Sequence, residues 1–248
     1  MPLRIKEVKW RVVFTIGSVF FLLEGMGCII FVFLECFAFG IWPPTLSWIY
    51  NYISHIPPLV LSLVLIQYHV KRFNGRWQDW GFRLKGGNLW LKTSFILALL
   101  WSIPDILQYF ASLLGLVEWM TPSPSLSAIL GGLLFDWTFL GISEEIFFRG
   151  FVQTYLMKNI EGYVRLVKWD FHIGTVVAAL LFGLSHLMNI LSMSPLLTLS
   201  YIVVSAFFGL TAGYVYQRTR SLIGPIIMHN VSSGIGLVAG LLLDPCFW

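Results

Sequence analysis

Two adjacent acids and one base, Glu144, Glu145 and Arg149, lie inside a single apolar stretch, in GISEEIFFRGF at residues 141–151. Unpaired charges are costly in hydrocarbon, so such residues need partners or a function. In a helix, Glu145 and Arg149 are four residues apart and share a face, with the acid on the N-terminal side, which is the favourable order for a pair. Glu144 is turned by about 100° and has no partner in its own helix. We therefore predict that Glu145 neutralises Arg149 and that Glu144 is free for chemistry.

Two of the five histidines are candidates to face Glu144. His186 lies in the middle of AALLFGLSHLMN, and His229 lies in LIGPIIMHNVSSG, where Pro225 fits the first turn of a helix. The other three, His55, His69 and His172, are predicted to be structural or interfacial, because His172 lies at the end of a span and the other two have no polar neighbours that suggest a site. One free glutamate and two histidines, on three different spans, form a specific set.

This set suits the hydrolysis of a peptide bond within a membrane. A glutamate shielded from bulk water can act as a general base on a water molecule. Histidines can orient that water, donate a hydrogen bond to an oxyanion or bind a metal. The sequence contains no HExxH, GxSxG or GxGxxG pattern and no paired GxGD-type aspartates. The markers of zincin-type, rhomboid-like serine and presenilin-like aspartyl proteases are therefore missing.

Three ordered patterns resemble a known family. Glu144-Glu145-Ile-Phe-Phe-Arg149 resembles the EExxxR motif of the CPBP family, the CAAX-protease and bacteriocin-processing intramembrane proteases, also called Abi. Phe182-Gly-Leu-Ser-His186 is similar to the FxxxH motif of that family, and His229, preceded by Gly224-Pro225, is similar to its third motif. The resemblance covers roughly residues 126–240. It implies an all-α bundle and a peptide hydrolase.

The resemblance also implies roles for individual residues. Glu144 and His186 would activate water, and His229 would hold the oxyanion together with an Asn or Asp four residues later. That later position is Ser233 here, which is a departure from the family pattern. A serine hydroxyl on the face of His229 can still donate one hydrogen bond, whereas Asn230 is about 100° away around the helix and is a poor substitute. Glu145, Arg149 and Phe182 would support the site.

The elements that must position these residues are transmembrane helices. Hydrophobic residues make up 57% of the 248 residues and charged residues only 11%, which excludes a soluble enzyme, a disordered tail and a disulfide-stapled secreted domain. Apolar stretches of about 20 residues or more can each cross a bilayer. Seven such stretches occur, at about 12–34, 46–70, 89–117, 126–157, 172–192, 196–217 and 222–243. We predict a polytopic transmembrane helical bundle of about seven spans, or eight with an additional broken or re-entrant segment.

The basic residues predict how the bundle is oriented. Fifteen of the sixteen Lys and Arg residues precede the first span or lie in alternate connections, and the connections around 35–45, 118–125 and 193–195 carry none. By the positive-inside rule the N-terminus is cytoplasmic and, with seven spans, the C-terminus is outside. We expect a multi-pass protein in the cell membrane of a prokaryote. This placement of the charges, rather than nucleic-acid binding, accounts for the net charge of +4.

The chain divides at one plausible boundary, the basic and Trp-containing stretch 71–92. We predict an N-terminal two-span leader with a cytoplasmic interfacial loop (1–88) and a five-span catalytic core (89–248). Other polar residues within spans, Glu24, Asp105 and Asp136, are expected to line a cavity or bind partner side chains. The three cysteines, Cys28, Cys36 and Cys246, have no metal-ligand spacing and are expected to be small apolar residues.

The leading hypothesis is an intramembrane endopeptidase that cuts a lipidated CAAX-type protein, a small peptide or a membrane-anchored precursor. The alternatives are a non-catalytic immunity or scaffold protein of the same fold, which Ser233 favours, and a proton-coupled transporter, for which no inverted repeat is visible. Glu144, His186 and His229 could form a His₂Glu zinc site, or the site could work without a metal. The expected partners are membrane lipid and the substrate, with no nucleic acid; the oligomeric state is left open.

Overall fold

The computed structural model describes residues 10–33, 48–84, 87–115, 125–191 and 193–243, without the side chains of residues 10, 23, 24 and 26–33. The Cys28 and Glu24 side chains, Cys36, Cys246 and both termini therefore lie outside the described residues. The helices are α1 (Trp10–Phe33), α2 (Trp48–Arg72), α3 (Asn88–Trp101), α4 (Ile103–Leu113), α5 (Leu126–Leu134), α6 (Leu140–Glu145), α7 (Thr154–Asn159), α8 (Ile173–Leu184), α9 (Pro195–Thr219) and α10 (Ile223–Leu243). Short 3₁₀-helical turns, η3 (Trp77–Trp80) and η6 (Ser185–Leu191), follow α2 and α8.

The all-α transmembrane fold predicted from composition is confirmed, and the chain is an integral membrane protein. Six helical segments are long and apolar enough to cross a bilayer, namely Trp48–Arg72, Asn88–Leu113, Leu126–Asn159, Ile173–Leu191, Pro195–Thr219 and Ile223–Leu243. They correspond to six of the seven predicted spans. The other predicted span corresponds to α1, whose 24 residues include the shorter apolar stretch Arg11–Leu22.

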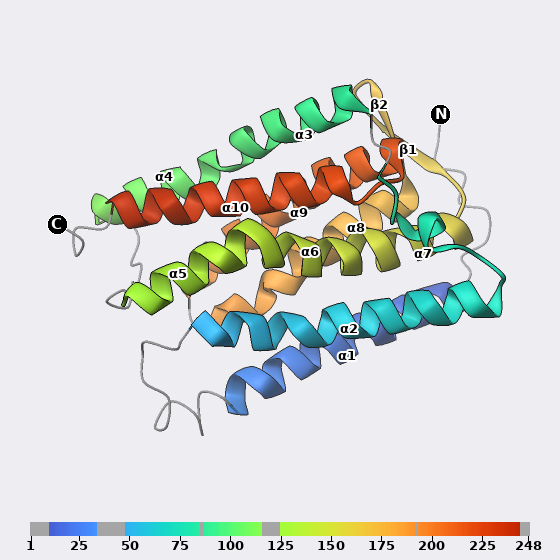
Figure 1. The fold of residues 1–248 in the computed structure, drawn as a ribbon, viewed down its shortest axis with the longest axis horizontal. Helices are drawn as coiled ribbons and strands as arrows, with labels where there is room; N and C mark the ends of the chain where they lie inside the picture. The colour runs from blue at the N-terminus through green and yellow to red at the C-terminus, as the bar shows by residue number, and fades with distance from the viewer. Residues whose placement is uncertain (1–9, 34–47, 85–86, 116–124, 192, 244–248) are drawn as a thin grey trace.

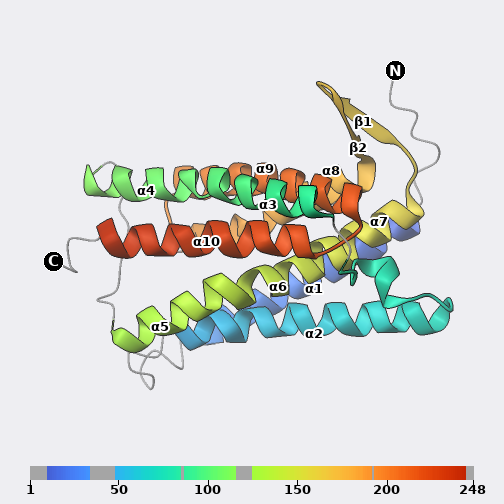
Figure 2. The same cartoon turned by 45° about the horizontal axis from the view of Figure 1, so that its top comes forward.

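A small antiparallel hairpin, β1 (Tyr163–Leu166) and β2 (Trp169–His172), joins α7 to α8 and was not predicted. Figure 2 shows it projecting from the end of the bundle at which α3 and α10 begin. The turn between α2 and α3 and the turn between α9 and α10 lie at that same end in Figure 1. The connections that carry the basic residues are therefore gathered at one end of the bundle, as the alternating pattern of Lys and Arg predicts.

The segment Leu126–Asn159, which carries the two glutamates, forms one continuous helix with two π-helical stretches. These are η4 (Phe135–Phe139), between α5 and α6, and η5 (Ile146–Gln153), between α6 and α7. We call this segment the motif helix. In both views α10 lies between α3–α4 and the motif helix, and α2 packs on the other side of the motif helix. π-Helical turns are rare and often occur at functional sites.

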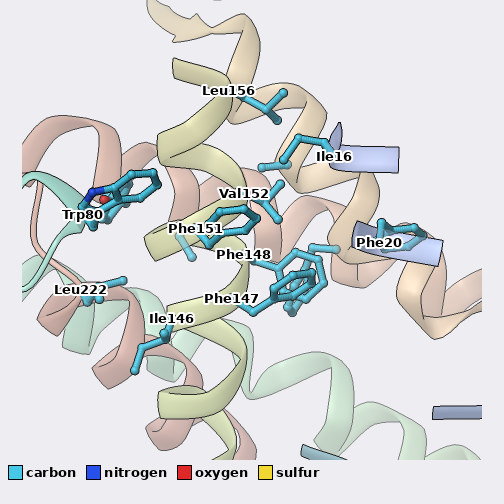
Figure 3. Close-up of a cluster of buried hydrophobic side chains, with 14 of the residues drawn as sticks. Ile16, Phe20, Trp80, Ile146, Phe147, Phe148, Phe151, Val152, Leu156 and Leu222 are labelled. Carbon is cyan, nitrogen blue, oxygen red and sulfur yellow. The ribbon is translucent and has the colours of Figure 1, made fainter. Parts of the chain in front are cut away.

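The hydrophobic core surrounds η5 (Figure 3). Phe147, Phe148, Phe151 and Val152 are buried on the motif helix, next to Ile16 and Phe20 of α1 and near Trp80 and Leu222. Ile66 of α2 belongs to the same core. Helices α1 and α2 therefore share a core with the helix that carries the glutamates, although they belong to the predicted leader. The division at residue 88 stays a prediction.

Small residues let α8 and α9 pack closely. A Cβ atom on Gly183 would lie 2.5 Å from the carbonyl oxygen of Ile202, and one on Gly209 would lie 3.2 Å from the Cα atom of Ala179. Glycines at such crossings allow the backbones of transmembrane helices to approach each other. The close packing holds Phe182 of α8 against Phe148 of the motif helix, with 4.9 Å between the ring centres.

Candidate active site

Glu145 and Arg149 form a buried ion pair, which confirms the predicted pairing. Oε1 of Glu145 accepts a hydrogen bond from Nη1 of Arg149 at 2.9 Å, and the two side chains are 0% and 2% exposed. Nη2 of Arg149 donates to the carbonyl oxygen of Gly209 at 3.2 Å, and its guanidinium group lies 4.6 Å from the centre of the Phe182 ring. The pair therefore fixes the motif helix against both α8 and α9.

His229 of α10 lies between the two glutamates. Its Nδ1 atom is 2.9 Å from Oε1 of Glu145, and its Nε2 atom is 3.8 Å from Oε2 of Glu144. A carboxylate paired with an arginine can only accept, so Nδ1 of His229 carries a proton and donates it to Glu145. In the neutral ring, Nε2 then presents its lone pair on the side of Glu144. Residue Pro225 lies in the first turn of α10, as predicted.

Glu144 differs from Glu145 in both exposure and contacts. Its side chain is 20% exposed, against 0% for Glu145, so Glu144 is the more accessible of the two carboxylates. Its Oε1 atom is 3.1 Å from Nε2 of His55 in α2, and its Oε2 atom faces His229. The sequence predicts only a structural or interfacial role for His55, so sequence reasoning missed its contact with Glu144. Asn51 and His55 share one face of α2, and this polar pair was the available signal.

His186 lies at the C-terminal end of α8, in η6. Its Nδ1 atom is 3.1 Å from the carbonyl oxygen of Phe182, which can only accept, so the Nδ1 atom of His186 carries a proton. The ring is 5.6 Å from that of Phe182, which is 5.9 Å from that of His229. Glu144 and His229 lie within electrostatic range of His186. Phe182 is therefore the shared packing surface of Arg149, His186 and His229.

Asn230 binds the backbone of the motif helix through both of its side-chain polar atoms. Its Oδ1 atom accepts a hydrogen bond from the backbone N–H of Gly141 at 2.7 Å, and its Nδ2 atom donates to the carbonyl oxygen of Thr138 at 3.0 Å. These backbone groups flank the junction between η4 and α6. A Cβ atom on Gly141 would lie only 2.5 Å from Oδ1 of Asn230 and 2.9 Å from Cβ of His229. The bare backbone at residue 141 thus lets α10 approach the motif helix.

Ser233 lies one turn after His229 and lines a cavity of about 180 Å³. Asp105, Asp136 and Tyr201 line the same cavity, together with Gln108, Tyr109, Gly236 and Leu237. The prediction that Asp105 and Asp136 line a cavity is confirmed. His69 packs among aromatic rings, including those of Trp80 and Tyr155, and His172 caps α8 through Nδ1, so both fit their predicted structural or interfacial roles.

The three candidate metal ligands do not form a ligand set. Within the described parts of the chain, no three His, Cys, Asp or Glu side chains are placed so that they could hold a metal ion. Glu144 faces His229, but the side chain that contacts it most closely is His55 rather than His186. The predicted His₂Glu arrangement is thus not supported by the geometry of these residues.

Comparison with known proteins agrees with the motifs. No curated protein and no solved structure matches the chain. A protein-family model described as type II CAAX prenyl endopeptidase Rce1-like matches residues 126–235. That range begins at the start of α5 and contains the two glutamates, His186, His229 and Ser233. The predicted family resemblance is therefore confirmed, since residues 126–235 of this chain are similar to the Rce1-like CAAX protease family.

Proposed function

We propose that this protein is an intramembrane endopeptidase that hydrolyses a peptide bond close to the C-terminus of a lipidated, CAAX-type protein. The observation that carries the proposal is the contrast between the two glutamates. Glu145 is fully buried and neutralises Arg149, whereas Glu144 is partly exposed and faces His229, within a segment that matches the CAAX endopeptidase family. A small peptide or a membrane-anchored precursor is the alternative substrate class.

In the proposed reaction Glu144 acts as the general base. It takes a proton from a water molecule that His186 orients through Nε2, and the water oxygen attacks the carbonyl carbon of the scissile bond. Ser233, one turn after His229 on α10, donates its hydroxyl hydrogen to the oxyanion, and His229 donates through Nε2 in the form of the ring that carries a proton on both nitrogens. When the tetrahedral intermediate collapses, the C–N bond breaks and Glu144 returns its proton to the leaving amine. The products are a carboxylic acid and an amine, which become a carboxylate and an ammonium group when the acid proton passes to the amine.

The position of the site in the membrane belongs to the same proposal. The bundle end that carries the basic connections faces the cytoplasm, so α1 and α10 both begin on the cytoplasmic side and the C-terminus is outside. The protein is placed in the cell membrane of a prokaryote. In this arrangement residues 89–248 hold the catalytic groups, and residues 1–88 form the N-terminal part.

The first test uses purified protein in detergent and a fluorogenic peptide that ends in a farnesylated CAAX sequence. We expect cleavage by the wild type, none by Glu144→Gln, and normal cleavage by Glu161→Gln, a control at an exposed glutamate outside the motif. Mass spectrometry of the products identifies the bond that is cut. Intact probe after incubation with the wild type, even though the probe binds, would instead support the non-catalytic scaffold, which the Ser233 departure favours.

A second experiment addresses metal dependence. The wild-type protein is treated with a chelator, its metal content is measured, and activity is followed before and after zinc is added back. Full activity after complete removal of metal is the result expected from a glutamate-activated water. Loss of activity that zinc restores would show a metallo-type mechanism.

A further inference from the structure

The closest side-chain partner of Glu144 comes from outside the segment that matches the family. Nε2 of His55 lies 3.1 Å from Oε1 of Glu144, and the two residues are 89 positions apart in the chain. His55 belongs to α2, whereas the family match begins at residue 126. This contact therefore joins the N-terminal part of the chain to the candidate general base.

The orientation of the His55 ring is fixed by its own helix. Nδ1 lies 2.7 Å from the carbonyl oxygen of Asn51, one turn earlier in α2. The carbonyl oxygen of Asn51 and the carboxylate oxygen of Glu144 can only accept, so Nδ1 donates to Asn51, Nε2 donates to Glu144, and the ring carries a proton on each nitrogen. The ring also packs edge-on against Phe135 of η4, with 5.0 Å between the ring centres. Both contacts limit the rotation of the ring.

The two carboxylate oxygens of Glu144 have different neighbours. Oε1 is held by His55, and Oε2 faces Nε2 of His229 at 3.8 Å, which is too long for a direct hydrogen bond. A carboxylate held at one oxygen keeps a defined orientation, and its other oxygen stays available to accept a proton. An unheld glutamate side chain would instead sample several rotamers.

We propose that His55 is a positioning residue that holds Oε1 of Glu144, so that Oε2 faces the bound water and the oxyanion side of the site. The inference rests on the proposed function, because the value of this orientation lies in the reaction of Glu144. It also gives α2 a role in the site, although α2 lies outside the residues that match the family. Correct alignment of a reacting group is worth a great deal, since a misplacement of 1 Å can cost about 10²-fold in rate.

The experiment compares His55→Leu with His55→Gln and with a matched control in the same helix. His69 is the control, because its Nδ1 atom also binds the carbonyl oxygen four residues earlier, that of Leu65, at 2.8 Å. Its ring packs against the ring of Trp80 instead of contacting a glutamate. We expect His55→Leu to lower kcat on the farnesylated probe by about 10²-fold with little change in KM. His55→Gln, whose amide can donate to Oε1, should recover kcat to within about tenfold of the wild type. His69→Leu should lower the melting temperature and leave kcat close to normal.

A second measurement does not depend on catalysis. In protein labelled with ¹⁵N-histidine, Glu144→Gln should shift the ring nitrogen resonances of His55 and leave those of His69 unchanged. Unshifted His55 resonances would overturn the contact, whether or not the probe is cut. A wild-type protein that fails to cut the probe would count against the proposed function alone. Normal kcat in His55→Leu, combined with an inactive Glu144→Gln, would overturn the positioning role and leave the proposed function intact.

Discussion

Nδ1 of His229 donates a hydrogen bond to the same carboxylate oxygen of Glu145 that accepts from Arg149, with both distances at 2.9 Å. Glu145 therefore does two tasks. It neutralises the buried guanidinium group of Arg149, and it selects the His229 tautomer whose Nε2 atom faces Glu144. The two adjacent glutamates are thus coupled through one imidazole ring, although they point to different sides of the motif helix.

The first prediction concerns these two glutamates and Arg149. Glu144→Gln keeps the side-chain shape and should give a stable, inactive protein. Glu145→Gln and Arg149→Gln each leave a buried partner unpaired, which should cost about 3–5 kcal/mol of unfolding free energy. Turnover and thermal unfolding are measured side by side, with Glu161→Gln as the control. A stable but inactive Glu145→Gln, with normal turnover in Glu144→Gln, would show that the base is the other carboxylate.

The second prediction concerns Ser233. Ser233→Ala should lower turnover by about tenfold, less than the 10²- to 10³-fold that the loss of an oxyanion donor can cost, because His229 remains. Ser233→Asn should be tolerated or raise turnover, since the longer amide reaches further and the residue lines a cavity of about 180 Å³. Steady-state kinetics on the farnesylated probe measure both changes. Equal turnover for Ser233→Ala and the wild type would mean that the oxyanion is held by other groups.

The third prediction concerns the approach of α10 to the motif helix. Gly141→Ala adds a Cβ atom against Asn230 and His229 and should destabilise the protein by about 1–3 kcal/mol while displacing His229. Gly132→Ala in the same segment is the matched control, because its Cβ atom would only touch Leu237 at 3.5 Å. Melting temperature and turnover are compared for both variants. Similar values for the two would argue against a required close contact at residue 141.

The fourth prediction concerns orientation in the membrane. Single cysteines at Arg76 and Ser125, in a background without Cys28, Cys36 and Cys246, should label from opposite faces of sealed cells. Arg76 is exposed near η3, and Ser125 is the N-cap residue of α5. The nearby Ser123 lies outside the described residues. Labelling of both cysteines by the same impermeant reagent, added from one side, would refute the proposed orientation.

The fifth prediction concerns pH. His172 caps α8 by accepting a hydrogen bond from the N–H of Gly174, and burial, with help from the charge of Arg220, lowers the pKa of His172 below its usual 6.5. The unfolded chain then binds more protons than the folded protein, so stability falls as the pH drops through about 6.5. His172→Asn keeps a capping acceptor without titrating. Its melting temperature should therefore depend less on pH between 5 and 8, and an unchanged dependence would exclude His172 as a cause.

Local patterns in the sequence predicted much of this structure. Long apolar stretches are sufficient to place helices, and the spacing of four between Glu145 and Arg149 is sufficient to predict their pairing. The hairpin was missed because Val167 adopts a positive φ of 57° in its turn, without the glycine or asparagine that normally marks such a turn. The contact between His55 and Glu144 was missed because it depends on how α2 packs against the motif helix, which no local pattern encodes.

The π-helical stretch η5 makes the length of the motif helix as important as its composition. Glu145 precedes this stretch and binds α10, while Gln153 ends it and donates to Thr175 of α8 and to the carbonyl oxygen of Gly213 in α9. Removing one residue between them would turn every later side chain by about 100°. Glu145 and Gln153 could then no longer reach their partners at the same time. Insertions and deletions between Glu145 and Gln153 should consequently impair the protein more than substitutions there, because the number of residues between these two anchors sets their relative direction.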